Sequence, residues 1–320
     1  MKGKSSLLAL ILGIIVPSIV LGFVKGPVPG KDQNVDSLET TVETKVLTGG
    51  ESRTVSVLQE DGSFTEMDLE SYLIGVLLCE MPVDFDIEAL KAQAVVARTY
   101  TLRRCLVVDK HDDNAVCTSP ECCQGYIDPA TYTDEQLQKI EEAVYATTNQ
   151  VLLYDGALIE ATYFSCSGGM TEDAKAVWGE DIPYLQARES PGEEKADHYS
   201  DIVRYSLDEF QNRLGISAAG PAESLVQNIT YTQGGGVDRM TIGGTDFTGV
   251  QLRKMLDLRS TAMIITAIGD TVTITTKGFG HRVGMSQYGA EAMALNGDSY
   301  EQILAHYYSG AELTEFNGFD

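Results

Sequence analysis

The hydrophobic positions just before Glu80 change their spacing from two residues to a helical period. The stretch "RTVSVLQEDGSFTEMDLESYL" alternates apolar and polar residues on both sides of Asp61-Gly62, which predicts two short strands joined by a tight turn. Asp68 then precedes a mostly apolar run that Pro82 interrupts. We therefore expect a helix that begins at Asp68 and ends at Glu80.

A second helix is expected to begin near Asp86, which can cap it, and to run to about Cys105. Its apolar residues surround it almost completely, so we predict a central buried helix. Two polar residues in it, Gln93 and Arg98, then need partners. Because a buried guanidinium is usually paired with a carboxylate, Glu80 is one candidate partner for Arg98.

The rest of the chain mixes hairpins with separate helices. Residues 134–147 read as a helix, and "QVLLYDGALIEATYFSCS" as a hairpin that turns at Asp155-Gly156. Residues 205–258 combine a short helix with turns and strands, and the chain closes with a strand pair, a glycine-rich loop and two helices. The fold class predicted is α+β, with antiparallel strands around the central helix.

The N-terminus carries an apolar run after Lys2 and Lys4. The run has about the length that spans a bilayer and no small-x-small cleavage site follows it, so we favour an uncleaved signal anchor over a removed signal peptide. Two lysines at the short end predict that the rest of the chain is exported. The expected organisation is an anchor at 1–29, a flexible linker at 30–50 and a single extracytoplasmic domain at 51–320.

The charge of the chain excludes one class of partner. Its 320 residues carry 23 Lys and Arg against 47 Asp and Glu, a formal net charge of -24. Such a surface repels phosphate backbones, and no basic arm or patch offsets it, so we expect no nucleic acid partner.

The six cysteines fall into two groups. Three are single residues among apolar or small neighbours, where a cysteine is usually a small buried hydrophobe: Cys79, Cys105 and Cys166.

The other cysteines belong to the stretch "HDDNAVCTSPECCQGY", which places His111, Cys117 and Cys123 six residues apart, with Cys122 adjacent. An imidazole and two thiolates are a reasonable zinc set, with water or another side chain in the fourth position. We therefore predict Zn²⁺ at His111, Cys117 and Cys123, in a structural rather than a catalytic role. The alternative is a disulfide between Cys117 and Cys122 or Cys123.

Glu80 is the strongest candidate for chemistry. It follows Leu77, Leu78 and Cys79 at a helix C-terminus and precedes Met81. An apolar surround and the helix dipole both raise the pKa of a carboxyl, as a general acid requires. The alternative is an acid that is simply solvated at a helix end.

Two glycine-rich segments come later in the chain. "YFSCSGGMTEDAKAVWGEDIPYL" leaves a strand with paired glycines, whose N–H groups can approach a ligand. "GFGHRVGMSQYGA" holds His281 between glycines ahead of a helix, where it is well placed to meet substrate.

Together these segments resemble the stage II sporulation protein D family, which shares a domain with amidase-enhancer proteins. The resemblance runs from about Arg53 to Gly310 through "EMP", "ALKAQAVVARTY", "SCSGG", "VWGEDIPYL", "GHRVGMSQYGA" and "ILAHYYSG". Two departures are Cys166 and Arg282, where smaller residues are expected.

The resemblance implies a lytic transglycosylase that cleaves peptidoglycan during engulfment of the forespore, with Glu80 as the catalytic acid. Glu80 would protonate the oxygen between N-acetylmuramic acid and N-acetylglucosamine, then accept the proton of the muramyl O6 hydroxyl as a 1,6-anhydro ring closes. Because water is not the nucleophile, no second carboxylate is needed. We expect the substrate groove to include Arg98, Tyr163, Ser165, Ser167, Gly168, Gly169, His281, Gln287 and Tyr288.

The resemblance also implies partners and a location. The substrate expected is glycan without stem peptides, prepared by the amidase stage II sporulation protein P, with stage II sporulation protein M as a membrane scaffold. The domain would then face the forespore from the mother-cell engulfing membrane.

Two other functions remain open at this point. A non-catalytic wall-binding activator of an amidase is the main alternative, and a zinc hydrolase using His111, Cys117 and Cys123 is another. A Ser-His hydrolase is disfavoured because Ser165 and Ser167 lack a nucleophile-elbow context.

Overall fold

The computed structural model describes residues 53–59, 61–108, 110–217 and 221–318. The expected signal anchor (1–29) and linker (30–50) lie outside these residues. Within the described ranges, no helix combines the length and the apolar character needed to cross a bilayer.

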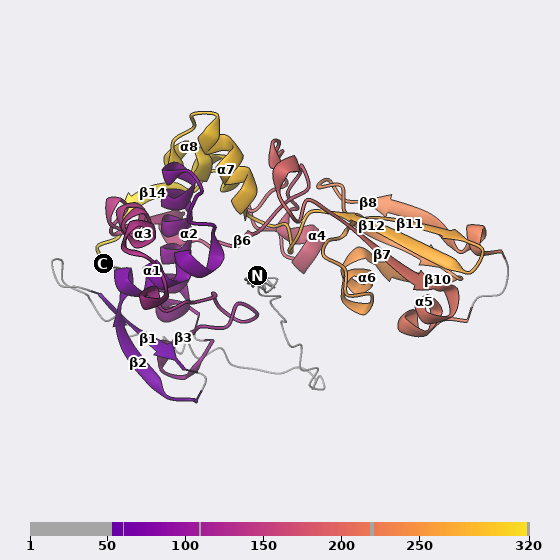
Figure 1. Ribbon diagram of the computed structural model, residues 1–320, viewed down its shortest axis with the longest axis horizontal. Helices are drawn as coiled ribbons and strands as arrows, with labels where there is room; N and C mark the ends of the chain where they lie inside the picture. The colour runs from indigo at the N-terminus through magenta and orange to yellow at the C-terminus, as the bar shows by residue number, and fades with distance from the viewer. Residues whose placement is uncertain (1–52, 60, 109, 218–220, 319–320) are drawn as a thin grey trace, which may run out of the picture.

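The fold is mixed α+β with several small sheets, which confirms the predicted class. Two lobes are visible in Figure 1, and each has its own hydrophobic core. The first core draws on residues from Val55 to Leu185 and again from Val283 to Phe316, whereas the second lies between Val203 and Ile274. The second lobe is therefore inserted into the first. The expectation of a single domain over residues 51–320 stays a prediction. Within the described part of this range, the hydrophobic core is divided in two.

The beginning of the first lobe follows the sequence pattern closely. Strands β1 (Thr54–Leu58) and β2 (Phe64–Asp68) pair antiparallel, and β3 (Val116–Cys117) joins β1 in parallel. Helix α1 (Leu69–Glu80) begins after Asp68, whose carboxylate accepts the N–H of Ser71 at 2.8 Å. Both helix limits confirm the prediction.

Helix α2 (Ile87–Leu106) is buried over much of its length, and Asp86 caps its first turn by accepting the N–H of Glu88 at 2.9 Å. Besides α1, the elements that pack most extensively against it are α3 (Asp134–Ala146), β4 (Gln150–Tyr154), α7 (Gln287–Leu295) and α8 (Tyr300–Tyr307). The alanines of α2 allow these close approaches.

The predicted hairpin turn at Asp155-Gly156 is confirmed. It joins β4 to β5 (Ala157–Leu158), and both turn residues have positive φ, 50° and 76°, as a tight hairpin turn of this kind requires. Strand β14 (Glu312–Glu315) pairs with the other edge of β4. Two very short strands, β6 (Tyr163–Phe164) and β13 (Met285–Ser286), pair in parallel beside α7.

The second lobe contains two three-stranded antiparallel sheets. One has the order β11-β12-β7 and the other β10-β9-β8. Their strands are β7 (Ser200–Ser206), β8 (Val226–Tyr231), β9 (Val237–Ile242), β10 (Thr245–Thr248), β11 (Ala262–Ile268) and β12 (Thr271–Lys277). The helices of this lobe are α5 (Leu207–Leu214) and α6 (Gly249–Met255), while α4 (Ala174–Trp178) precedes it. The chain enters at Ser200 and leaves at Lys277, which are paired neighbours in the sheet.

A buried ion pair joins the two lobes. Arg282 Nη1 lies 3.3 Å from Glu172 Oε1, and both side chains are almost fully buried. The same glutamate oxygen accepts the N–H of Gly236 at 2.9 Å and the hydroxyl of Thr232 at 2.8 Å, while Arg282 Nη2 donates to the carbonyl of Gly234 at 2.7 Å. A Cβ at Gly236 would lie 2.2 Å from Glu172 Oε1, so this glycine permits the contact.

Candidate active site

Glu80 is the last residue of α1 and is only 4% exposed. Its Oε1 accepts the backbone N–H of Gly125 at 2.6 Å. Its Oε2 has no hydrogen-bond partner among the described residues, although the atom is buried. One carboxyl oxygen is thus held in place, and the other keeps its capacity for a proton.

Burial raises the pKa of the Glu80 carboxyl from 4.5 to about 7. The N–H of Gly125 and the hydroxyl of Tyr163 act in the opposite direction, because each stabilises the carboxylate. A carboxyl with such a pKa is present in both protonation states near neutral pH, which suits a group that first gives and then takes a proton.

The segment after the cysteine cluster forms one wall of this site. Gly125 packs so closely that a Cβ there would lie 2.6 Å from Cys79 Sγ and 3.2 Å from Glu80 Oε1. The preceding residue, Gln124, donates from Nε2 to Thr101 Oγ1 at 2.8 Å and accepts the hydroxyl of Tyr163 at 3.3 Å. Because residue 125 has no side chain, its backbone N–H can come close enough to donate to the Glu80 carboxyl.

Helix α7 holds the end of α1 from the other direction. Gln287 donates from Nε2 to the backbone carbonyl of Glu80 at 3.0 Å, which satisfies one of the carbonyls that a helix C-terminus leaves free. The N–H of Tyr288 donates to the carbonyl of Ser165 at 3.1 Å, and its ring meets Phe85 edge to face at 5.1 Å. Of the expected groove residues, Tyr163 and Gln287 are thus brought to Glu80. Tyr288 follows Gln287 directly, and Ser165 lies two residues after Tyr163.

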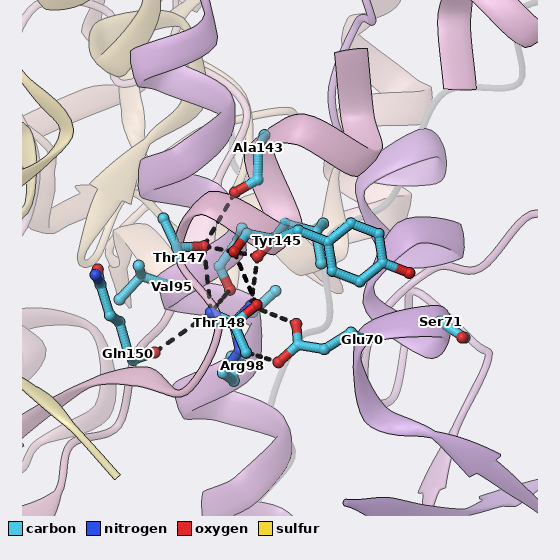
Figure 2. Close-up of polar contacts among 12 residues, drawn as sticks. Glu70, Ser71, Val95, Arg98, Ala143, Tyr145, Thr147, Thr148 and Gln150 are labelled. Carbon is cyan, nitrogen blue, oxygen red and sulfur yellow. Dashed lines mark hydrogen bonds and ion pairs between the residues drawn. The ribbon is translucent and has the colours of Figure 1, made fainter. Parts of the chain in front are cut away.

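Arg98 has a different partner from the one considered in the sequence. Its guanidinium binds Glu70, with Nε 3.1 Å from Oε1 and Nη2 2.5 Å from Oε2 (Figure 2). It also donates to the carbonyls of Val144 and Gln150, at 3.1 and 3.3 Å. The pairing with Glu80 is therefore wrong, because the first turn of α1, and not its last, faces Arg98. The Arg98 side chain is fully buried in this contact.

The backbone N–H groups of the loop at residues 167–169 are bound by an acid that the sequence analysis did not single out. The N–H groups of Ser167, Gly168 and Gly169 all donate to Glu193 Oε2, at 2.9, 2.8 and 3.3 Å. In the sequence, Glu193 lies in the polar run "SPGEEKADH", which has no pattern that distinguishes a buried acid from a solvated one.

His281 is buried, 8% exposed, between Phe164 and Trp178, with ring centroids at 5.6 and 5.5 Å. Its Nδ1 accepts the N–H of Val283 at 3.1 Å. Burial, with a smaller contribution from Arg253, lowers the pKa of His281 to about 3. The imidazole is therefore neutral at ordinary pH, and its contacts are those of a packed residue.

The cysteine cluster is assembled as a possible metal site. The ligand atoms of His111, Cys117, Cys122 and Cys123 all lie within 4.8 Å of one another. His111 Nε2 is 3.4 Å from Cys122 Sγ and 3.3 Å from Cys123 Sγ. A hydrogen bond from Cys123 lowers the pKa of the Cys117 thiol to about 4. All six cysteines are described and none forms a disulfide, so the structure supplies Cys122 as a fourth candidate ligand.

Comparisons with known proteins identify the family of the chain. The family model described as "Stage II sporulation protein" matches residues 59–154, which include Glu80 and the cysteine cluster. Stage II sporulation protein D of Bacillus subtilis (strain 168) is 37% identical, and the match covers 98% of this chain and 95% of that protein. The same-named protein of Bacillus amyloliquefaciens is 39% identical over 80% of this chain and 77% of its own length.

A relative with another name shares much of the same region. The "Amidase enhancer" of Bacillus subtilis (strain 168) is 30% identical over 76% of this chain, which covers 40% of that protein. The identity to the two sporulation proteins is higher, and the match to the Bacillus subtilis one extends over nearly the whole of this chain. The chain belongs to the stage II sporulation protein D family.

Proposed function

We propose that this protein is a peptidoglycan lytic transglycosylase in which Glu80 acts as both acid and base. The observation that carries the proposal is the state of the Glu80 carboxyl, which is buried, has a pKa of about 7 and has one oxygen without a partner in the described chain. Most buried carboxyls have both oxygens hydrogen-bonded. Glu172 Oε2 also has no partner in the described chain, but Glu172 is ion-paired with Arg282.

The chemistry needs one carboxyl in two successive states. Protonated Glu80 donates its proton to the glycosidic oxygen between N-acetylmuramic acid and N-acetylglucosamine, and the C1–O bond breaks. The carboxylate then takes the proton of the muramyl O6 hydroxyl as O6 bonds to C1, closing the 1,6-anhydro ring. The proton that Glu80 gave is thereby returned, and no water is consumed.

Substrate must also reach a side chain that is only 4% exposed. Glu80 Oε1 is tied to Gly125, so Oε2 is the oxygen that meets the glycan. Binding therefore requires a local displacement of the groups that cover Oε2. The closed arrangement keeps water away from the carboxyl and sustains its raised pKa.

The test uses residues 35–320 and peptide-free glycan strands. We expect mass spectrometry to find 1,6-anhydro-muramyl ends with the parent protein and none with Glu80→Ala. Cys79→Ser changes the adjacent residue of the same helix end and should leave the product unchanged. Reducing ends in place of anhydro ends would contradict the reaction type.

The match to the amidase enhancer supports a second candidate, a non-catalytic protein that binds the wall and activates an amidase. In that case Glu80→Ala would stimulate an added wall amidase as well as the parent does. Intact strands from a folded protein that still binds glycan would favour this function over transglycosylation.

We also propose that the cysteine cluster binds Zn²⁺. Three thiols and one imidazole fit the tetrahedral preference of zinc, and the His111–sulfur distances are close to the separation of about 3.6 Å that ordinary zinc bond lengths give. With four protein ligands present, the metal would stabilise the loop from His111 to Cys123 rather than supply a reactive water.

Metal content and unfolding temperature test this site without an activity assay. One zinc per chain is expected for the parent and for Cys105→Ser, which lies outside the cluster, and less for Cys117→Ser. A chelator should lower the unfolding temperature of the parent only. Metal loss that abolished cleavage without changing the fold would instead support a zinc hydrolase.

Family membership further supports a role in engulfment at the outer face of the mother-cell membrane. The proposed substrate is denuded glycan, supplied by stage II sporulation protein P, and the proposed scaffold is stage II sporulation protein M. Treating sacculi with the amidase first should increase the rate of anhydro-end formation. Equal rates on intact and denuded sacculi would contradict this order of steps.

A further inference from the structure

Glu193 is a buried acid that the proposed chemistry does not use. Its side chain lies in a short 3₁₀ turn (Glu193–Lys195) and is 1% exposed. Besides the three loop N–H groups, its Oε2 accepts the hydroxyl of Ser167 at 2.7 Å and the thiol of Cys166 at 3.3 Å. Each of these groups donates, which suits the acceptor-only form of a carboxylate.

The second oxygen of Glu193 reaches the start of α7. Glu193 Oε1 accepts the hydroxyl of Ser190 at 2.7 Å and that of Ser286 at 2.5 Å. Ser286 is the N-cap of α7, because its Oγ also accepts the N–H of Gly289 at 3.2 Å. The negative charge therefore lies beside a helix N-terminus, where the helix dipole favours it.

Gly289 makes this approach possible. A Cβ at position 289 would lie 2.1 Å from Ser190 Oγ and from Tyr307 Oη, and 2.9 Å from Glu193 Oε1. A side chain at this point would thus push the first turn of α7 away from Glu193.

The first turn of α7 also contacts Glu80, the proposed catalytic acid. Gln287, the residue after Ser286, donates to the backbone carbonyl of Glu80, and Tyr288 donates to Ser165. A continuous path of hydrogen bonds and adjacent residues therefore runs from Glu193 through Ser286 and Gln287 to Glu80.

We propose that Glu193 is a positioning residue for Glu80. Glu193 binds both the loop at residues 167–169 and the first turn of α7. It thereby fixes the position from which Gln287 binds the end of α1. This inference rests on the proposed function, since it gives Glu193 a purpose in the transglycosylase reaction. Glu193 itself does not contact the substrate.

The matched variants are Glu193→Gln, Ser286→Ala and Ser190→Ala. The two serines donate to the same oxygen of Glu193, but only Ser286 begins α7. Because small misplacements of a reacting group are costly, we expect kcat to fall about tenfold or more in Glu193→Gln and Ser286→Ala with KM nearly unchanged. Ser190→Ala should keep the parent kcat.

A double variant separates positioning from general loss of structure. If Glu193 acts through Gln287, Glu193→Gln combined with Gln287→Ala should have the same kcat as Gln287→Ala alone. Losses that multiply, or a fall in kcat as large in Ser190→Ala, would overturn the proposal.

Amide hydrogen exchange gives a readout that does not depend on catalysis. Glu193→Gln should speed exchange at the N–H groups of Tyr288 and Gly289, while Ser190→Ala should not. If the parent protein cleaves no glycan, the proposed function fails, and this measurement still decides the positioning. Unchanged exchange at both N–H groups in Glu193→Gln would overturn it.

Discussion

Two regions of the first lobe bury a carboxylate in opposite ways. At the end of α1, Glu80 receives one backbone N–H and leaves an oxygen without a partner in the described chain. In the loop that precedes β7, Glu193 receives hydrogen bonds on both oxygens, from backbone and side-chain groups on Oε2 and from two serine hydroxyls on Oε1. The two side chains are 4% and 1% exposed, so burial alone does not distinguish them.

The difference lies in the number of donors. A buried carboxylate surrounded by donors is stabilised in its charged form and contributes to structure. A buried carboxyl with few donors keeps its proton to higher pH. Its burial lowers the stability of the folded state, and interactions elsewhere in the fold must compensate for that. Within one lobe, the sparse site is the one expected to do chemistry.

The largest effect is expected on the reaction itself. Glu80→Gln keeps the shape of the side chain but removes its exchangeable acid, so the rate of anhydro-end formation should fall at least about 1000-fold. Glu193→Gln should lose far less, since it acts on position only. A Glu80→Gln rate within tenfold of the parent would abolish the distinction between the two carboxylates.

The order reverses for stability. Glu193→Leu leaves its buried donors without an acceptor, so the free energy of unfolding should fall by about 3–5 kcal/mol. Glu80→Leu removes a carboxyl that only the N–H of Gly125 and the hydroxyl of Tyr163 stabilise, and should change stability by less than about 1.5 kcal/mol. Urea unfolding of both variants measures this, and equal losses would show that donor number does not matter here.

Glu80 should add its own pH dependence to stability, opposite in sign to that of His281, whose lowered pKa makes its contribution disappear as the pH falls. Its pKa is about 7 in the folded protein against 4.5 ordinarily, so the folded state holds this proton more tightly than the unfolded chain. The stability it contributes is complete below pH 4.5 and is lost as the pH rises to about 7, on the order of 3 kcal/mol.

Comparing the parent with Glu80→Gln isolates this contribution. Between about pH 5 and about pH 8, the free energy of unfolding should fall more in the parent than in the variant, because only the parent releases this proton. Parallel curves for the two proteins would mean that Glu80 has an ordinary pKa.

The smallest effect concerns the hydrogen bond from Gly125. Gly125→Ala introduces a Cβ that must displace Cys79 Sγ, and so should shift the N–H away from Glu80 Oε1. We expect kcat to fall about tenfold, which corresponds to about 1.4 kcal/mol. Gly156→Asn, at a hairpin turn with positive φ that asparagine tolerates, is the control and should keep the parent kcat. An unchanged kcat in Gly125→Ala would remove this N–H from the site.

Local features of the fold could be predicted from the sequence. Asp68 caps α1 and Pro82 follows its end, so the position of Glu80 at a helix C-terminus was accessible from local chemistry. The turn at Asp155-Gly156 was likewise encoded by two residues that accept positive φ.

Partnerships across the fold could not be predicted. Arg98 pairs with Glu70, which lies 28 residues earlier, and only the packing of α1 against α2 selects it among many acids. Glu193 is buried because a loop beginning near Ser167 wraps around it, and its own neighbours in sequence are polar. The second core was missed because strand alternation does not show which strands pair.

The way the second lobe joins the first makes it an exchangeable unit. Ser200 and Lys277 are paired neighbours, and the N–H of Gly278 donates to the carbonyl of Tyr199, so the inserted chain starts and finishes at one place. A relative could replace everything between these residues with a short turn, or with an unrelated domain, without rerouting the chain around Glu80. The contacts it would forfeit include those that Glu172 and Arg282 make with the loop at Gly234 and Gly236, and the hydrogen bond from the N–H of Gly280 to the carbonyl of Arg259.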